Sequence, residues 1–204
     1  MTILLANGDF PESAELRRQL RKAERVVCCD GAALALLEFG RMPDVVVGDL
    51  DSLGELPKEL EGRVVHVREQ ETNDLSKAFR HCISQGWCDL TIMGATGRRE
   101  DHTLGNISLL ADFAKQAPSI TMQTDYGCFF PMLESGSFAT VAGQQISIFA
   151  LESGTAITSK GLKYAMKDFV PRAWWQATLN EAVESTVSLS FTTGKPLIVF
   201  KCHL

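Results

Sequence analysis

Acidic side chains gather in three short segments of the sequence, at residues 48–52, 71–74 and 98–102. Asp49 and Asp51 directly follow an apolar run at residues 45–47. If a strand continues through them, side chains two residues apart project from the same face about 6.5 to 7 Å apart. Two carboxylates at that spacing can share one Mg²⁺ ion, and arginines beside them can bind a polyphosphate.

Asp74 stands at the start of a segment whose apolar residues follow a helical period, at Leu75, Ala78, Phe79, Cys82 and Ile83. Either Thr72 or Asn73 would cap this helix. Each carboxylate also has a simpler interpretation, because residues 51–54 can form a turn and Asp74 can complement the helix dipole. Their joint placement after predicted strands favours a cation site, since crowded carboxylates without a cation repel one another.

The glycine-bearing segment at residues 94–97 follows another predicted strand and is followed by Arg98 and Arg99. Its backbone N–H groups, the two guanidinium groups and the next helix N-terminus could together bind phosphate. Neither a P-loop nor a dinucleotide fingerprint occurs in the chain. His102 and Asn106 lie close by in sequence, and His102, which alone would more often be a surface or capping residue, is predicted to contact phosphate or the metal's surroundings.

Short apolar runs alternate with amphipathic segments through residue 125. Strands are predicted near residues 3–6, 26–29, 45–47, 64–67 and 90–93, and helices near 13–22, 32–39, 103–115 and after Asp74. This alternation predicts an α/β domain with a mostly parallel, helix-covered sheet that binds ligands at the carboxyl ends of its strands.

After residue 126 the sequence pattern changes to short extended runs separated by glycine, at 145–150, 156–159, 187–191 and 196–200. These runs predict an all-β antiparallel sandwich, although the segment 168–176 is ambiguous. We therefore expect two domains, 1–125 and 126–204.

Composition excludes several classes of protein. The formal net charge of -5 and the absence of a dense basic run argue against a nucleic-acid binder. No apolar stretch is long enough for a membrane span, and the first residues do not resemble a signal peptide. The six cysteines form no CxxC pair, so zinc and redox sites are not predicted. A cytoplasmic location is the simplest expectation.

Five segments, taken in order, resemble the thiamine pyrophosphokinase family: residues 29–33, 48–52, 70–75, 94–102 and 161–164. The resemblance spans nearly the whole chain. It implies an α/β catalytic domain, a β-sandwich that binds thiamine, and a homodimer whose active sites lie between one subunit's catalytic domain and its partner's sandwich. It also implies transfer of a pyrophosphoryl group from ATP to the thiamine hydroxyl, with release of AMP.

Matched by position, the resemblance assigns Mg²⁺ to Asp49, Asp51 and Asp74. Phosphate binding or orientation of the reacting groups falls to Gln70, Asn73, Arg99 and Asp101, and Asp30 completes the acidic pocket. Either Asp74 or Asp101 accepts the hydroxyl proton. For thiamine, Tyr164 stacks on the ligand, unless it packs on the strand surface, and Asn180 makes a polar contact.

The chain departs from the family's pattern at two positions. Leu179 stands where a serine is common, so one hydrogen bond to the ligand is missing unless Thr178 replaces it. Arg98 stands where a second glycine is common. Two alternatives therefore stay open: a pyrophosphokinase for a related heterocyclic alcohol, and a sensor that binds thiamine or a nucleotide without chemistry.

Overall fold

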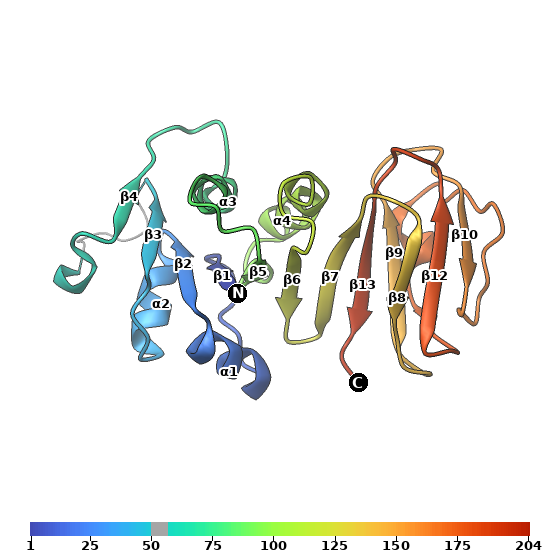
Figure 1. Ribbon diagram of the computed structural model, residues 1–204, viewed down its shortest axis with the longest axis horizontal. Coiled ribbons are helices and arrows are strands. Elements are labelled where there is room, and N and C mark those ends of the chain that lie inside the picture. Colours follow the sequence, from blue (N-terminus) through green and yellow to red (C-terminus); the bar gives the residue numbers. More distant parts are fainter. Residues whose placement is uncertain (50–56) are drawn as a thin grey trace. The chain divides into compact units, whose positions relative to one another are not determined.

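The computed structural model describes residues 1–49 and 57–204 and divides into two compact domains. The first domain is Met1–Asp125 and the second is Tyr126–Leu204. Figure 1 labels their helices and strands. Helices belong to the first domain, and the second is built mainly from strands (Figure 1).

The first domain is a parallel sheet. Its strands are β1 (Thr2–Leu5), β2 (Arg25–Cys29), β3 (Val45–Gly48), β4 (Val64–His66), β5 (Leu90–Met93) and β6 (Thr121–Thr124). They run in the order β6-β5-β1-β2-β3-β4, and every neighbouring pair is parallel. The chain adds strands on one side of β1 up to β4 and then places β5 on the other side. Reversals of this kind put a ligand-binding crevice at the carboxyl ends of the two strands involved.

Helices cover this sheet. They are α1 (Ala14–Lys22), α2 (Ala32–Glu38), α3 (Asp74–Ser84) and α4 (Glu100–Phe113), with a short 3₁₀ helix, η1, at Lys58–Leu60. In the view of Figure 1, α1 and α2 lie on one side of the strands and α3 and α4 on the other. Strands β1, β2, β4 and β5 each lead at their carboxyl ends into a helix, as the alternating sequence pattern predicts.

Both faces of the sheet are buried. One core joins alternate strand residues such as Ile3, Val26 and Val46 to apolar residues of α1 and α2. The intervening strand residues, including Leu4 and Val27, are equally buried and point to the opposite face. Strands covered on both faces read as continuous apolar runs, which explains why β1 to β3 show no alternation.

Two helix starts matter for the site. At α3 the Asn73 side chain caps the helix by accepting a hydrogen bond from the Ser76 N–H at 3.0 Å. Of the two predicted cap residues, Thr72 and Asn73, the cap is therefore Asn73. Helix α4 begins at Glu100, three residues earlier than the sequence pattern indicates. Arg99 is its N-cap residue, and Asp101 and His102 consequently lie in the first helical turn rather than in a loop.

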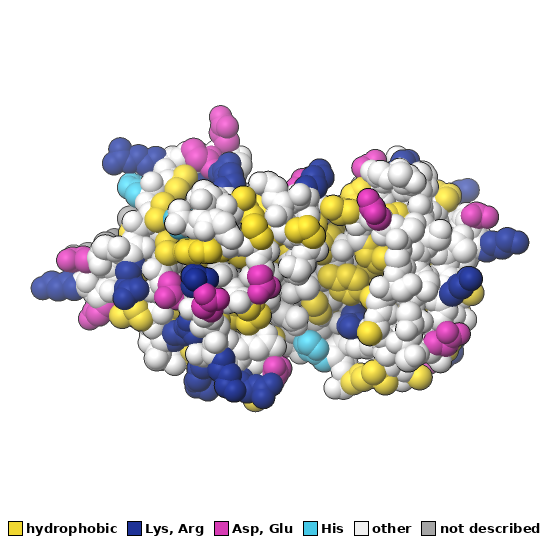
Figure 2. All heavy atoms as spheres, in the orientation of Figure 1, with side chains coloured by type: hydrophobic (Ala, Val, Ile, Leu, Met, Phe, Trp, Pro, Cys, Tyr) yellow, Lys and Arg dark blue, Asp and Glu magenta, His cyan; other side chains and the backbone are white. Residues whose placement is uncertain are grey.

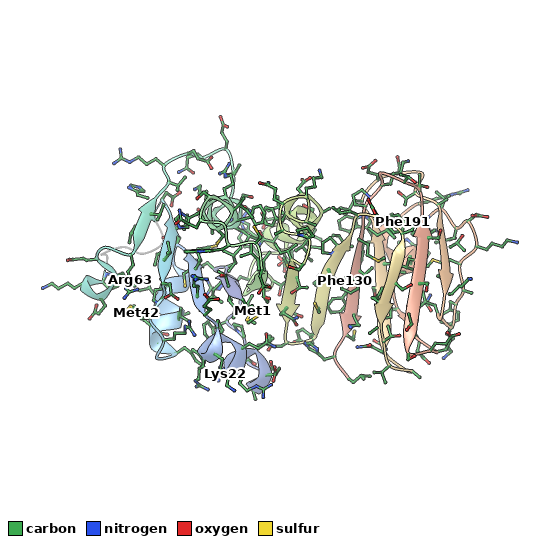
Figure 3. All side chains as sticks on the ribbon, in the orientation of Figure 1. Met1, Lys22, Met42, Arg63, Phe130 and Phe191 are labelled. Atoms are coloured by element: carbon green, nitrogen blue, oxygen red, sulfur yellow. The ribbon has the colours of Figure 1, made fainter. Side chains whose placement is uncertain are left out.

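The second domain contains two antiparallel sheets. One has the order β11-β9-β13-β7, built from Asn180–Glu181, Gln145–Ala150, Leu197–Cys202 and Gly127–Met132. The other has the order β10-β12-β8, built from Ile157–Lys160, Thr186–Phe191 and Gly136–Ala139. Phe130 and Phe191, labelled in Figure 3, help to form their common core. The ambiguous segment 168–176 is largely irregular, and η2, at Trp174–Ala177, is a single 3₁₀ turn.

Charged side chains of both signs are dispersed over the face shown in Figure 2, with a basic group gathered over α1. Among the described helices, none is at once long and apolar enough to cross a bilayer. The fold class predicted from the sequence is confirmed: an α/β domain with a parallel sheet, followed by an all-β antiparallel domain.

Candidate active site

A pocket of about 420 Å³ opens in the first domain where the strand order reverses. Residues at or after the carboxyl ends of β1 to β5 line it, together with the starts of α3 and α4. Its described lining consists of Ala6, Asn7, Gly8, Cys29, Asp49, Gln70, Thr72, Asn73, Asp74, Leu75, Lys77, Ala95, Gly97, Arg98, Arg99, His102 and Asn106. Most of the predicted phosphate and metal residues therefore meet in one cavity.

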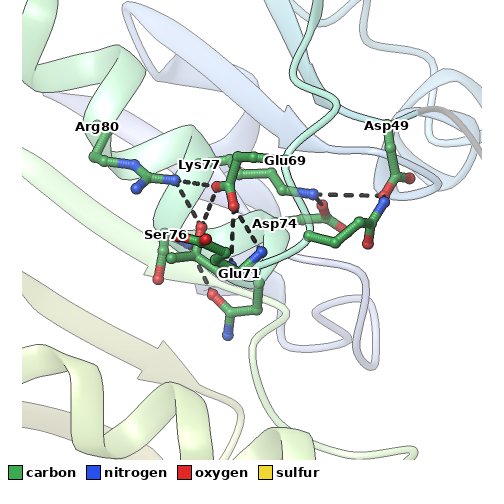
Figure 4. A network of polar contacts seen from close by, with 10 residues as sticks. Asp49, Glu69, Glu71, Asp74, Ser76, Lys77 and Arg80 are labelled. Atoms are coloured by element: carbon green, nitrogen blue, oxygen red, sulfur yellow. Dashed lines mark hydrogen bonds and ion pairs between the residues drawn. The ribbon is translucent and has the colours of Figure 1, made fainter.

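A buried lysine joins two of the predicted metal ligands. The Lys77 ammonium lies 3.0 Å from Asp74 Oδ1 and 3.4 Å from Asp49 Oδ2 (Figure 4). Gln70 Nε2 donates a second hydrogen bond to Asp49 Oδ2 at 3.0 Å. Burial alone would lower the pKa of Lys77, but its hydrogen bonds and ion pairs with Asp74 and Asp49 outweigh burial and raise that pKa. The ammonium is therefore charged, and both carboxylates face it.

The loop that carries Gln70 is held by the neighbouring Glu69. Its carboxylate accepts hydrogen bonds from the Glu71 N–H at 2.8 Å and the Thr72 N–H at 3.1 Å. The Thr72 hydroxyl and the Arg80 guanidinium also bind it (Figure 4). These donors, the Thr72 hydroxyl first among them, lower the pKa of Glu69 to about 2. An ionised Glu69 thus ties the loop to α3 and fixes where Gln70 points.

The predicted phosphate loop is tied to the segment after β1. Gly8 N–H donates to the Gly94 carbonyl at 2.7 Å, and Asp9 N–H donates to the Thr96 carbonyl at 2.9 Å. Arg98 has a left-handed backbone, with φ of 56°, where a glycine would be unstrained. Its guanidinium donates to both the carbonyl and the side-chain oxygen of Asn7, each at 3.0 Å. The departure from the family's glycine therefore adds a clamp across the pocket rim.

Arg99 and Asp101 form an exposed ion pair at the start of α4. Arg99 Nη2 lies 2.6 Å from Asp101 Oδ2, and Arg99 Nε lies 3.1 Å from Oδ1. The hydrogen bonds from Arg99 lower the pKa of Asp101. Arg99 and His102 line the pocket, whereas Asp101 is not among the described lining residues.

Asn106 and Asp30 support the pocket from within the domain. The Asn106 amide donates to the Ala95 carbonyl at 2.9 Å and accepts a hydrogen bond from Asn73 at 3.0 Å. It therefore connects the phosphate loop to the cap of α3. Asp30 is almost completely buried just after β2, outside the described pocket lining. Gly48 packs over it so closely that a Cβ there would lie 2.9 Å from the Asp30 Cβ.

The structure brings together only part of the predicted metal set. Asp49 and Asp74 share one neighbour in Lys77, so a single ion could reach both carboxylates, and oxygen donors suit Mg²⁺. Within residues 1–49 and 57–204, no three His, Cys, Asp or Glu side chains are placed to hold a metal by themselves. Asp51, the third predicted ligand, lies outside the described residues.

The second domain has its own pocket, of about 400 Å³. Tyr164, Thr178 and Asn180, the predicted thiamine contacts, all line it. The Asn180 side chain accepts a hydrogen bond from the Tyr164 N–H at 3.1 Å and donates one to the Tyr164 carbonyl at 2.8 Å. Asn180 thereby fixes the backbone of Tyr164 and leaves the tyrosine ring exposed. Leu179 lines the same pocket with a left-handed backbone, at φ of 57°.

Comparison with known proteins gives both domains a family. Residues 16–122 match the thiamin pyrophosphokinase catalytic domain, and residues 127–200 match the thiamin pyrophosphokinase substrate-binding domain. The chain belongs to the thiamin pyrophosphokinase family. Members of this family transfer a pyrophosphoryl group from ATP to thiamine, giving thiamine diphosphate and AMP. The family and the enzymatic reaction predicted from the sequence are confirmed.

Individual thiamin pyrophosphokinases resemble the chain over most of their length. It is 34% identical over 174 residues to thiamine pyrophosphokinase of Bacillus subtilis, covering 81% of each chain. It is 24% identical over 197 residues to thiamin pyrophosphokinase 1 of Caenorhabditis elegans, covering 90% of this chain and 80% of that one. The solved structure of the Bacillus subtilis enzyme superposes over 100% of both chains with a TM-score of 0.78 at 22% identity.

Three residues of the pocket, Lys77, Asn7 and Gly8, lie outside the motifs that predicted the site. Lys77 stands three residues after Asp74, a spacing that places both on one helix face and could have indicated their contact. Asn7 and Gly8 follow the first predicted strand, where the rule for carboxyl ends of strands applies equally. No sequence signal linked Lys77 to Asp49, which lies 28 residues earlier.

Proposed function

We propose that this chain performs the family's reaction in the pocket of its first domain, with magnesium held by Asp49 and Asp74 and by Asp51 from the adjoining segment. The observation that carries this assignment is the convergence of Asp49 and Asp74 on Lys77 in a cavity that Arg98 and Arg99 also line. A bound magnesium ion would neutralise phosphate charge and polarise the phosphorus that is attacked.

The remaining groups align the substrates. Arg99 and His102 extend donors toward the phosphates, and the backbone after Gly94 supplies N–H groups. Gln70 holds Asp49 in place through its 3.0 Å hydrogen bond. Alignment and charge neutralisation are the main requirements of phosphoryl transfer, because the protein needs to form no covalent intermediate.

For the proton of the thiamine hydroxyl, the contacts favour Asp74 over Asp101. Asp74 lines the pocket, and about a third of its side chain is exposed. Both oxygens of Asp101 are engaged by Arg99, which lowers the pKa of Asp101 and weakens it as a base. On this assignment Asp74→Asn lowers kcat far more than Asp101→Asn does, which initial rates of AMP formation at saturating ATP, MgCl₂ and thiamine measure.

Thiamine is assigned to the second-domain pocket, where the exposed Tyr164 ring can stack on it. Asn180 holds that ring in position through the Tyr164 backbone. Thr178 donates its hydroxyl proton to the Trp175 carbonyl at 2.7 Å, so an acceptor lone pair remains for the ligand. Leu179 supplies apolar contact where the family commonly has a serine.

We also assign the chain to a homodimer in which each active site uses residues of both subunits. Light scattering after size exclusion measures the mass directly. Mixing inactive Asp49→Asn protein with inactive Tyr164→Ala protein tests the shared site, because mixed dimers would regain one intact site. Recovery of AMP production supports the arrangement, and a dimer that gives no recovery after subunit exchange contradicts it.

The decisive assay identifies the nucleotide product. Purified protein is incubated with ATP, MgCl₂ and thiamine, and the products are separated by chromatography. We expect AMP and thiamine diphosphate in equal amounts, and neither from Asp49→Asn. ADP with thiamine monophosphate would refute the mechanism, because it requires attack at a different phosphorus. Rapid turnover of an altered heterocyclic alcohol with none of thiamine would favour the alternative substrate, and binding without AMP formation would favour the sensor.

A further inference from the structure

Lys77 is a buried cation in the middle of the proposed metal site. Its side chain is 2% exposed, whereas Asp49 and Asp74 are 18% and 36% exposed. Lysine is rarely buried so completely unless its charge is paired. Here the ammonium contacts one oxygen of each carboxylate, and it bridges the end of β3 to the start of α3 (Figure 4).

The chain contains a matched pair without these features. Lys115 and Asp112 in the α4 region have the same three-residue spacing, and their charged atoms lie 2.7 Å apart. Both of those side chains are more than 60% exposed, and exposed pairs contribute little to stability. The spacing alone therefore does not explain the bridge at Lys77. Its distinguishing features are burial and the second carboxylate, Asp49.

We propose that Lys77 is a positioning residue that holds Asp49 and Asp74 together in the metal-free protein and competes with the divalent cation for their oxygens. This inference rests on the proposed function, because it takes both aspartates to be metal ligands. The contacts support it directly: the oxygens that face Lys77, Asp49 Oδ2 and Asp74 Oδ1, are donors that a cation in the pocket would also attract.

The charges give the direction of each effect. Without Lys77, two carboxylates would face each other in a partly buried cavity, and their repulsion would destabilise the metal-free protein. The same change would remove a positive charge beside the cation. Gln70 would still donate to Asp49, so one carboxylate keeps its orientation. A divalent ion should consequently bind the variant more tightly and restore its stability.

The test uses the full chain and Lys77→Met, which removes the charge and keeps a flexible apolar stem. Lys77→Gln is a second neutral variant, and Lys77→Arg retains the charge. Lys115→Met, just beyond the end of α4, is the control for losing the lysine of an exposed i,i+3 ion pair. Melting temperatures are measured in EDTA and in MgCl₂. Binding of Mn²⁺ alone, without nucleotide, is followed by electron paramagnetic resonance.

We expect both neutral variants to melt below the wild type in EDTA and to gain more from MgCl₂ than the wild type does. Their dissociation constant for Mn²⁺ should fall by about tenfold, as expected for loss of one nearby positive charge. Lys77→Arg and Lys115→Met should bind Mn²⁺ like the wild type. If the neutral variants lose stability equally in EDTA and MgCl₂ and bind Mn²⁺ no more tightly, Lys77 is purely structural and the inference is wrong.

Product analysis separates this result from the proposed function. If the wild type forms AMP and thiamine diphosphate while the neutral variants show no gain in Mn²⁺ affinity, only the role of Lys77 fails. If the wild type neither binds Mn²⁺ nor forms AMP, the proposed metal site itself fails.

Discussion

The hydrogen bonds of Asn106 allow a quantitative prediction about how the phosphate loop is held. Asn106 is 9% exposed, and its amide joins the Ala95 carbonyl at 2.9 Å to the Asn73 side chain at 3.0 Å. Asn106→Ala removes both bonds and leaves the buried Ala95 carbonyl without this donor. Two bonds at about 1 kcal/mol each give a loss of about 2 kcal/mol in the free energy of unfolding.

For a domain of this size, that loss lowers the melting temperature by roughly 8 °C. The loop and the α3 cap also lose their connection, so kcat/KM for ATP should fall by roughly 10-fold to 100-fold. Calorimetry of the first domain and initial rates of AMP formation measure the two effects. Ser108→Ala is the control, because this exposed hydroxyl on the same helix bonds only the Gly105 carbonyl among the described contacts.

Asn106 has no such role if Asn106→Ala melts within about 1 °C of the wild type and keeps its kcat/KM for ATP. That result would mean that the Ala95 carbonyl finds another donor and that the loop is positioned without α4. A large loss of stability with normal kcat/KM would keep the packing argument and remove the link between Asn106 and nucleotide binding.

Three further predictions concern the same pocket. Gly97→Ala should destabilise the domain and raise the KM for ATP, because the φ of Gly97 is 77° and a Cβ there would lie 2.0 Å from Asp9 Oδ2. The matched control is Gly105→Ala on α4, where a Cβ meets open space. In thermal melts this control should stabilise the protein by about 0.5 to 1 kcal/mol. Glu69→Gln should lower the melting temperature by a constant amount across about pH 6 to 8. Since the pKa of Glu69 is lowered from 4.5 to about 2 in the folded state, this difference should disappear as the pH falls through that range, and a difference that grows in acid would contradict it. Asp49→Asn should reduce turnover strongly and also lower the melting temperature, because it removes one of the two carboxylates that pair the buried Lys77 ammonium; preserved AMP formation would overturn its assigned role.

Local sequence signals predicted the parts of the fold that depend on local contacts. The α3 helix, for example, is marked by both its apolar period and the Asn73 cap, and both stand in one short segment. The start of α4 was misplaced because apolar periodicity begins only after Arg98 and Arg99 have turned the chain into the helix. Strand β7, which the predicted runs do not include, contains Pro131, and proline weakens the strand signal in a sequence pattern.

The pocket residues that stand in short motifs were also predictable, whereas the long-range contacts between them were not. Asp49, Gln70 and Asp74 were identified because short motifs carry them, and the parallel sheet brings those motifs to one edge. The clamp between Arg98 and Asn7 joins residues 91 positions apart, so only the tertiary structure reveals it. The same is true of the Lys77 contact with Asp49. Which side-chain oxygens face one another in the pocket depends on the order of the strands in the sheet. No local sequence pattern predicts that order.

The distribution of the cysteines decides where a chemical label can be attached. Burial raises the pKa of the Cys28 and Cys29 thiols and raises that of Cys82 to about 12, so these three resist alkylation. Cys88 is the exposed one of the six. It precedes β5, whereas the pocket lies beyond the other end of that strand, roughly 20 Å away along an extended chain. A maleimide dye at Cys88 would therefore give a fluorescent reporter that leaves the opening of the pocket clear.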